Sequence, residues 1–167
     1  SDDAELNKRL ISSAIDCGVN YFESTRLYLG GTCQHRTAPG LAGKTAGVIV
    51  SGKEGINSDK SAYAFRREIE RQLDILGLTH FKFFQVGWFK WERMCHLLKP
   101  GGVLDALRQA QREGLIQCVG FTGHDSPENF IKCIETGLFD SCTVPYNMIN
   151  RRYEPLIKRA GELGVGV

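Results

Sequence analysis

The sequence predicts an α/β fold in which a parallel β-sheet forms part of a (β/α)8 barrel, with about five to six βα units in one domain over residues 1–167. Short apolar segments alternate with amphipathic segments of helical length, which is the pattern of βαβ units. Polar residues able to carry chemistry follow the predicted strands, where barrels place catalytic groups. An open doubly wound sheet would also fit the helix count, but no G-x-G-x-x-G follows a predicted strand.

The first elements are a helix and a strand. Asp2 and Glu5 have capping-box spacing, which predicts a helix over Asp2–Cys17 with an apolar stripe of Leu6, Leu10, Ala14 and Ile15. The first strand is expected over Val19–Phe22. The next segment, Thr32–Lys44, favours a loop or a broken helix because it contains Pro39, Gly40 and Gly43.

The middle of the chain has clearer signals. A strand is expected over Val48–Ser51, and Ser58 or Ser61 can cap a long helix that ends at Gly77. Its inward face would be Phe65, Ile69, Leu73 and Leu76. A third strand is expected over Phe81–Val86, followed by a loop with a short helix over Trp88–Leu98.

The last elements repeat the alternation. Ser126 and Pro127 are a typical helix start, and this helix should end near Gly137. The remaining expectations are a helix over Val103–Glu113, strands over Gln117–Thr122 and Ser141–Tyr146, a helix over Pro155–Leu163, and the beginning of a sixth strand at Val165–Val167.

Composition excludes several classes of partner. The chain has 167 residues, a net charge of +2 and no basic block, which argues against nucleic-acid binding. No apolar run approaches ~18 residues, and no signal peptide is recognisable from Ser1. Six cysteines are present without a C-x-x-C pair or zinc spacing, so we expect no metal site and a reducing compartment, the cytoplasm.

One segment combines groups that could transfer a proton. Glu23 ends the first predicted strand, Tyr28 follows five residues later, and Lys53 comes at the end of the next strand. A nearby ammonium lowers the pKa of a phenol because it favours the phenolate, and such a phenol can exchange a proton near neutral pH. Alternatively, a tyrosine after a strand packs with its hydroxyl bonded, and a lone lysine is solvated.

These residues also resemble the signature of the aldo-keto reductase family, a strand ending in Phe-Asp-Thr-Ala followed by a Tyr. The resemblance covers nearly the whole chain and continues in Val48–Lys53, Leu73–Val86, Gly101–Thr122 and Tyr146-Asn147. Pro100-Gly101-Gly102 and the Gly-Phe-Thr-Gly-His segment Gly120–His124 are similar to a bacterial branch of the family. The resemblance implies a (β/α)8 barrel, with the first and last barrel strands lacking from residues 1–167.

The resemblance assigns roles in the site. Tyr28 would be the general acid, Lys53 would activate it, and Glu23 would orient Lys53 in place of the customary Asp. Gly87 stands where the family has a His that places the carbonyl, so the substrate pocket would involve Gly87, Trp88 and His124, with Trp91 as a further candidate to fill the gap. Lys82 replaces a customary acid, and we expect its amine to pair with Glu23 or Glu54.

The family uses NADP(H), and the resemblance implies cofactor-binding residues at Thr122, Gly123, Thr143 and Tyr146, whereas the late aromatic that stacks on the nicotinamide cannot be assigned. Two of these positions differ from the family pattern: Thr122-Gly123 replaces Ser-Asn, and Thr143 replaces Gln. The loops that bind the cofactor phosphates in the family have no counterpart here. Binding of NADP(H) and a site without a cofactor are therefore both open.

Three functions follow from these residues. The first is reduction of a small carbonyl compound with NADP(H), and the second is cofactor-independent acid–base catalysis such as dehydration, isomerisation or lyase chemistry at the same site. The third is a non-catalytic family descendant. The sequence is either part of a longer protein or a short relative, and a short relative should form a homodimer through its open sheet edges.

Overall fold

The computed structural model describes residues 3–56 and 61–167, and a five-stranded parallel sheet is its central feature. The strands follow one another in chain order, so each hydrogen-bonds to the next. They are β1 (Tyr21–Ser24), β2 (Ile49–Gly55), β3 (Phe81–Gly87), β4 (Ile116–Thr122) and β5 (Ser141–Thr143). The curved sheet forms half of a barrel, which confirms the predicted fold class.

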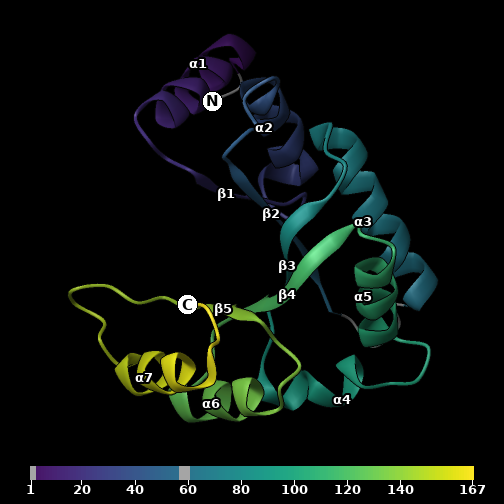
Figure 1. The fold of residues 1–167 in the computed structure, drawn as a ribbon, viewed down its shortest axis with the longest axis vertical. Coiled ribbons are helices and arrows are strands. Elements are labelled where there is room, and N and C mark those ends of the chain that lie inside the picture. Colours follow the sequence, from purple (N-terminus) through teal and green to yellow (C-terminus); the bar gives the residue numbers. More distant parts are fainter. Residues whose placement is uncertain (1–2, 57–60) are drawn as a thin grey trace.

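Helices connect successive strands and lie outside the curve of the sheet (Figure 1). The α3 and α5 helices cover its convex side, while α1 and α2 lie beyond one end of the sheet and α6 and α7 beyond the other. The helices are α1 (Ala4–Asp16), α2 (Cys33–Leu41), α3 (Ala62–Leu76), α4 (Met94–Leu97), α5 (Val103–Arg112), α6 (Pro127–Glu135) and α7 (Glu154–Leu163), with short 3-10 turns η1 (Leu29–Gly31) and η2 (Trp91–Arg93).

The apolar core lies between the sheet and these helices. Phe84 of β3 packs edge-on against Phe65 of α3, with ring centroids 6.0 Å apart. Phe121 of β4 contacts Phe130 and Phe139 in the same manner, at 5.0 and 4.8 Å. The helices therefore bury these rings on the convex side of the sheet.

Predicted caps locate two helices accurately. Ser61 accepts a hydrogen bond from the amide of Ala64 at 3.2 Å and begins α3, and Gly77 ends it in the left-handed conformation. Ser126 caps α6 in the same way, with Pro127 at its first position. The alternative cap at Ser58 lies outside the described residues.

Three predictions for the first third of the chain are wrong. The cap of α1 is Asp3, which accepts from the amide of Leu6, and Asp2 lies outside the described residues. The predicted inward residue Leu10 is 58% exposed, whereas Ile11 and Ile15 pack against the core. The strand β1 begins two residues later than predicted, at Tyr21.

Thr32–Lys44, predicted as a loop or a broken helix, contains the continuous helix α2 over Cys33–Leu41, with Pro39 inside it. The contact with α1 explains why a glycine occurs inside this helix, because a Cβ at Gly40 would lie 2.5 Å from the Cβ of Ile11 in α1. The glycine therefore permits close packing of the two helices and does not break α2.

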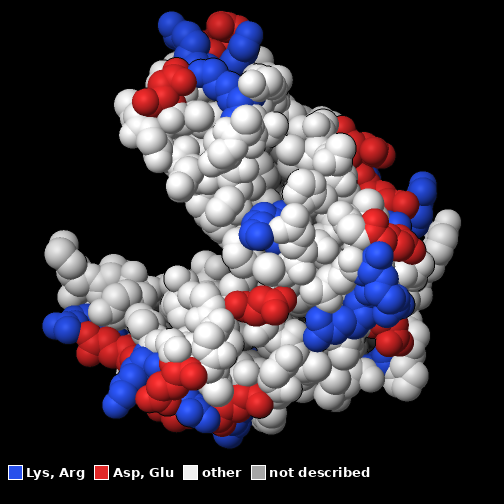
Figure 2. Space-filling view, in the orientation of Figure 1, with Lys and Arg blue, Asp and Glu red and all other residues white. Residues whose placement is uncertain are grey.

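The end of the sheet is shorter than predicted. The strand β5 stops at Thr143, and the expected sixth strand is reduced to one bridge between Ser141 and Gly166. A hollow of about 400 Å³ opens on the concave side, lined by Tyr21, Phe83, Gln85, Ser141, Cys142, Thr143, Gly166 and Val167. Figure 2 shows that the wide notch between the two ends of the molecule is mostly uncharged, with charges gathered on the outer surface.

Candidate active site

A chain of three polar side chains lies at the carboxyl ends of β1 and β2. The amine of Lys53 donates to Oε1 of Glu23 at 2.6 Å and to the hydroxyl of Tyr28 at 3.1 Å. The same amine lies 4.7 Å from the centre of the Tyr28 ring. Lys53 is 5% exposed and Tyr28 is 48% exposed, so the buried amine joins a partly exposed carboxylate to a phenol that solvent and ligands can reach.

The environment of Lys53 keeps its amine charged. Burial acts to lower the pKa of Lys53, but the hydrogen bonds to Glu23 and Tyr28 and their charges outweigh it, so the pKa is raised above its ordinary value of 10.5. A permanent cation therefore lies beside the phenol oxygen at neutral pH.

Backbone contacts hold Lys53 and the Tyr28 loop together. The hydroxyl of Thr25 donates to the carbonyl oxygen of Lys53 at 2.8 Å and accepts from the amide of Leu27 at 3.2 Å. The amide group of Gln72 in α3 donates to the same Lys53 carbonyl, and Gln34 in α2 donates to Gln72 at 2.9 Å. The buried amides thus connect two helices to the strand end that carries Lys53.

The loop that carries Tyr28 is also held by ion pairs. Nε of Arg26 lies 2.5 Å from a carboxylate oxygen of Glu68 in α3 and 3.5 Å from one of Glu54 in β2. Both carboxylates are largely buried, at 11% and 3% side-chain exposure. The guanidinium therefore fixes the loop against α3 two residues before Tyr28.

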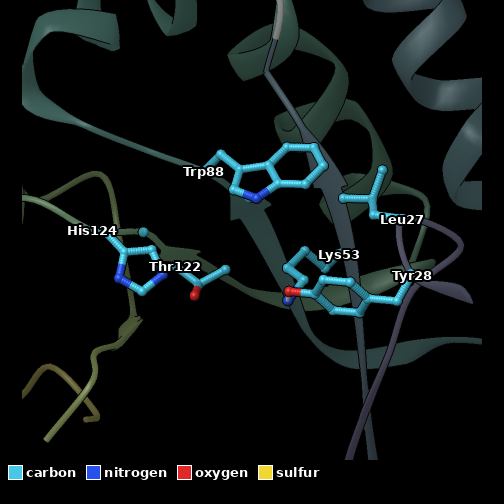
Figure 3. A pocket seen from close by; sticks show the side chains of 8 residues that line it. Leu27, Tyr28, Lys53, Trp88, Thr122 and His124 are labelled. Carbon is cyan, nitrogen blue, oxygen red and sulfur yellow. Dashed lines mark hydrogen bonds between the residues drawn. The ribbon is translucent and has the colours of Figure 1, made fainter.

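These groups open into a small pocket of about 40 Å³. In Figure 3 the Tyr28 hydroxyl and the Lys53 amine lie together on one side, the Trp88 ring lies above them, and Thr122 and His124 lie across from them. The lining residues are Leu27, Tyr28, Lys53, Gly87, Trp88, Thr122, Gly123 and His124. Leu27 is the one member that the sequence analysis did not single out.

Gly87 leaves room where a side chain would enter the pocket. A Cβ at Gly87 would lie 3.1 Å from Cγ of Lys53 and 3.4 Å from the carbonyl oxygen of Glu54. The following residue, Trp88, has a positive φ of 51°, which is a strained conformation for a bulky side chain. Its ring lies over Gly55, where an added Cβ would be 3.0 Å from the ring.

Gly123 brings two loops into contact beside the pocket. A Cβ at Gly123 would lie 2.0 Å from the carbonyl oxygen of Phe89, so only glycine allows this approach. The amide of Phe89 also donates to the carbonyl of Thr122 at 2.9 Å. The end of β4 is therefore fastened to the loop that follows Trp88.

Two of the expected cofactor residues lie apart from this pocket. Thr143 lines the concave hollow together with Gln85 and Ser141. Tyr146 is exposed in the loop after β5, and its hydroxyl donates to Glu154 at 3.3 Å. The expected pairing of Lys82 with Glu23 or Glu54 is wrong, since its amine donates to Gln117 at 2.8 Å on the surface.

The described residues have neither a metal-binding arrangement nor a membrane span. In residues 3–56 and 61–167, no group of three or more His, Cys, Asp and Glu side chains is placed to hold a metal ion. Across the same residues, every helix is too short or too polar to cross a bilayer.

Solved structures with the same fold are aldo-keto reductases. A provisionally assigned aldo-keto reductase from Pseudomonas aeruginosa is 26% identical with a TM-score of 0.81, and the match covers 98% of this chain and 64% of that one. An aldo-keto reductase from Bacillus halodurans in its holo form is 19% identical with a TM-score of 0.83, covering 100% and 57%. One from Klebsiella pneumoniae, in complex with NADP and acetate, is 15% identical with a TM-score of 0.80, covering 99% and 57%.

The chain therefore spans about three fifths of the length of these relatives. No curated protein matches it. The model of the aldo/keto reductase family matches residues 1–167, the whole sequence. The fold, the order of the strands and this match agree, and the chain belongs to the aldo/keto reductase family.

Proposed function

We propose that this chain carries the proton-transfer site of an oxidoreductase that reduces a small carbonyl compound with NADP(H). The observation that carries the proposal is the chain of contacts from Glu23 through Lys53 to the Tyr28 hydroxyl, at 2.6 and 3.1 Å. Tyr28 is exposed and lines the pocket, whereas Lys53 is buried and Glu23 does not line it, so Tyr28 is the member able to reach a substrate.

Each residue has a distinct task in this reaction. Tyr28 donates its phenolic proton to the carbonyl oxygen as negative charge develops there. The Lys53 ammonium stabilises the phenolate that remains, and Glu23 holds the ammonium in place. Gly87 and Trp88 shape the space for the carbonyl compound, and His124 offers a hydrogen-bond donor across the pocket.

Part of the expected cofactor set fits the nicotinamide end of the cofactor. Thr122 lines the pocket with Tyr28 and Lys53 and would hold the carboxamide, while Gly123 keeps the backbone of the β4 end free of a side chain. Thr143 and Tyr146 lie in and after the neighbouring strand β5, apart from this pocket, so we assign them no contact with the ring. When bound, the cofactor supplies a hydride to the carbonyl carbon.

NADPH oxidation with a panel of small aldehydes and ketones tests this proposal. Tyr28→Phe should lower kcat by about 100-fold or more, because it removes the acid while keeping the ring. Tyr63→Phe is the matched control, since Tyr63 is exposed on α3 and is not among the residues that line the pocket, and it should leave turnover unchanged. Absence of NADPH binding, or equal turnover by Tyr28→Phe, would contradict the proposal.

A cofactor-independent acid–base reaction is the second candidate. It is favoured by one observation: the Tyr28–Lys53–Glu23 contacts lie wholly within this chain, whereas Gly87 supplies no imidazole to place a carbonyl for reduction. Proton exchange at the α-carbon of a ketone, measured by NMR in deuterated water without nicotinamide, separates the two. Exchange that requires Tyr28 supports this candidate, and a non-catalytic protein would show neither activity.

The proposed partners are a small carbonyl compound and a second copy of the chain. The second copy is proposed because β1 and β5 are the edge strands of the sheet, and open sheet edges pair readily with strands of another chain. The cysteines are free throughout the described residues, which fits the proposed reducing compartment, the cytoplasm.

A further inference from the structure

A second hollow adjoins the Tyr28 pocket on the same rim of the sheet. It measures about 380 Å³ and is lined by Trp88, Lys90, Arg93 and His124. Trp88 and His124 also line the Tyr28 pocket. A ligand bound beside Trp88 can therefore extend from Tyr28 into this second hollow.

The loop that carries the two cations is fixed against the loop that carries His124. The amide of Trp91 donates to Oδ2 of Asp125 at 2.9 Å, and the amide of Phe89 donates to the carbonyl of Thr122 at 2.9 Å. These bonds lie on either side of Lys90. These bonds hold the backbone that carries Lys90 beside the His124 loop, and the amide of Arg93 donates to the carbonyl of Lys90 at 2.9 Å, which keeps the two cations on one turn.

Among residues 3–56 and 61–167, Arg93 uses one of its donors, which leaves others for a ligand. Its Nη1 donates to the carbonyl of Ile56 at 3.4 Å, which orients a guanidinium with five N–H donors. A guanidinium presents two parallel donors to a carboxylate or phosphate, and the exposed ammonium of Lys90 adds a second positive charge.

Two acids, Asp125 and Glu92, lie near Lys90 and offset part of its charge, which leaves Arg93 as the principal cation of the hollow. Asp125 accepts three hydrogen bonds, from the amides of Trp91 and Ser126 and from the side chain of Asn129, at 2.8–2.9 Å. Burial acts to raise the pKa of Asp125, but these hydrogen bonds and the nearby charge of Lys90 lower it, so the carboxylate stays ionised and its oxygens are held by its own loop. Glu92 lies 4.0 Å from Lys90 and is 72% exposed, where an ion pair contributes little.

From this arrangement we propose that the hollow is an anion subsite, and that the substrate carries a carboxylate or phosphate group that Arg93 and Lys90 bind while its carbonyl reaches Tyr28. Trp88 forms the wall between the two positions and contacts the uncharged part of the substrate. The assignment of the carbonyl end rests on the proposed function, whereas the anion subsite depends only on the cations and their placement.

Binding measured without turnover tests the subsite directly. The variant Trp91→Phe leaves Trp88 as the single tryptophan, because the chain has two, and its fluorescence reports ligands at the shared wall. The probes are 4-formylbenzoate, 4-formylphenyl phosphate and the neutral methyl 4-formylbenzoate. We expect the two anions to bind about tenfold or more tightly than the ester, and added salt to reduce this difference.

Arg93→Gln in this background should weaken binding of both anions on the order of tenfold, and Lys90→Gln should do the same to a smaller degree. Arg67→Gln is the matched control, since Arg67 is an exposed arginine on α3 paired with Glu70. Circular dichroism checks that each variant is folded, and Lys90→Gln, at an exposed side chain, serves if Arg93→Gln does not fold.

The outcomes separate this subsite from the proposed function. Anion binding that depends on Arg93 but is followed by no NADPH-dependent turnover supports the subsite and contradicts the reduction. Turnover of all three aldehydes with equal kcat/KM in wild type and Arg93→Gln overturns the subsite while the reduction stands. Equal affinity for the anions and the ester also overturns the subsite. Displacement of the anions by NADP+ overturns it as well, because it would assign Arg93 and Lys90 to cofactor binding.

Discussion

Lys53 keeps a charged amine in a nearly buried position because two oxygens share it. Replacing Lys53 by Met leaves the Glu23 carboxylate without this partner. Since the Glu23 side chain is 25% exposed, we expect a loss of about 1–2 kcal/mol in the free energy of unfolding, between the values for exposed and buried pairs. Denaturant unfolding near neutral pH measures this loss.

The raised pKa of Lys53 makes the stability difference between wild type and Lys53→Met depend on pH. Because the pKa is raised in the folded protein, the stabilisation is complete below the ordinary value of 10.5 and is lost as pH rises through the folded value. The difference between wild type and Lys53→Met should therefore stay constant up to about pH 10 and shrink above it. Lys82→Met is the control, since this amine bonds Gln117 at the surface, and a parallel loss there would refute the assignment.

Gly87 allows the missing imidazole to be restored. A new Cβ there requires the Lys53 stem to shift by a few tenths of an ångström, because Cγ is 3.1 Å away. If carbonyl reduction is the function, Gly87→His should raise kcat/KM for small carbonyl compounds by about tenfold over Gly87→Ala, because the imidazole adds a donor to the carbonyl oxygen. Steady-state kinetics of both variants decide this, and equal values would mean that the pocket holds its substrate differently.

At the scale of elements, Gly40 sets the distance between α1 and α2. Gly40→Ala places a Cβ 2.5 Å from that of Ile11, so the helices must separate, and we expect a loss of about 1–3 kcal/mol in the free energy of unfolding. Gly161→Ala in α7 is the matched control, because nothing lies within 4 Å of its Cβ and alanine favours helix by about 1 kcal/mol. Thermal unfolding should shift in opposite directions for the two variants.

The same element shows what local sequence signals can and cannot predict. Caps such as Ser61, Ser126 and Gly77 act within a few residues, so their helices were located correctly. Pro39 and Gly40 are residues typical of a loop, yet they lie in the helix α2. This helix forms because it packs against α1, which precedes β1 in the chain. Tertiary contact decides such cases, and the sequence pattern does not contain it.

The sequence predicted the candidate site about as far as it predicted the helices. The positions of Glu23, Tyr28 and Lys53 at strand ends led to the expectation that they meet, and they do. The buried bonds behind them, from Gln34 to Gln72 and on to the Lys53 carbonyl, join residues 38 and 19 positions apart and have no sequence signature. Their partners become known only when the fold brings the helices to the strand.

At the scale of the whole molecule, the half-barrel leaves one face of its sheet uncovered. Tyr21 in the edge strand β1 is 41% exposed on the hollow of the concave side, and Phe83 and Val167 line the same hollow. In the described part of the chain, β1 pairs along one edge with β2 alone. Unpaired strand edges next to apolar surface favour association.

We therefore expect residues 1–167 to form a dimer in solution, and light scattering over a range of concentrations measures its mass. Tyr21→Lys should shift the protein toward the monomer, because a charge on an edge strand opposes pairing. Tyr63→Lys is the matched control, since Tyr63 is 75% exposed on α3, a helix of the convex side, and is not among the residues that line the hollow. A wild-type monomer at every concentration, or the same shift in both variants, would mean that this face does not join two copies.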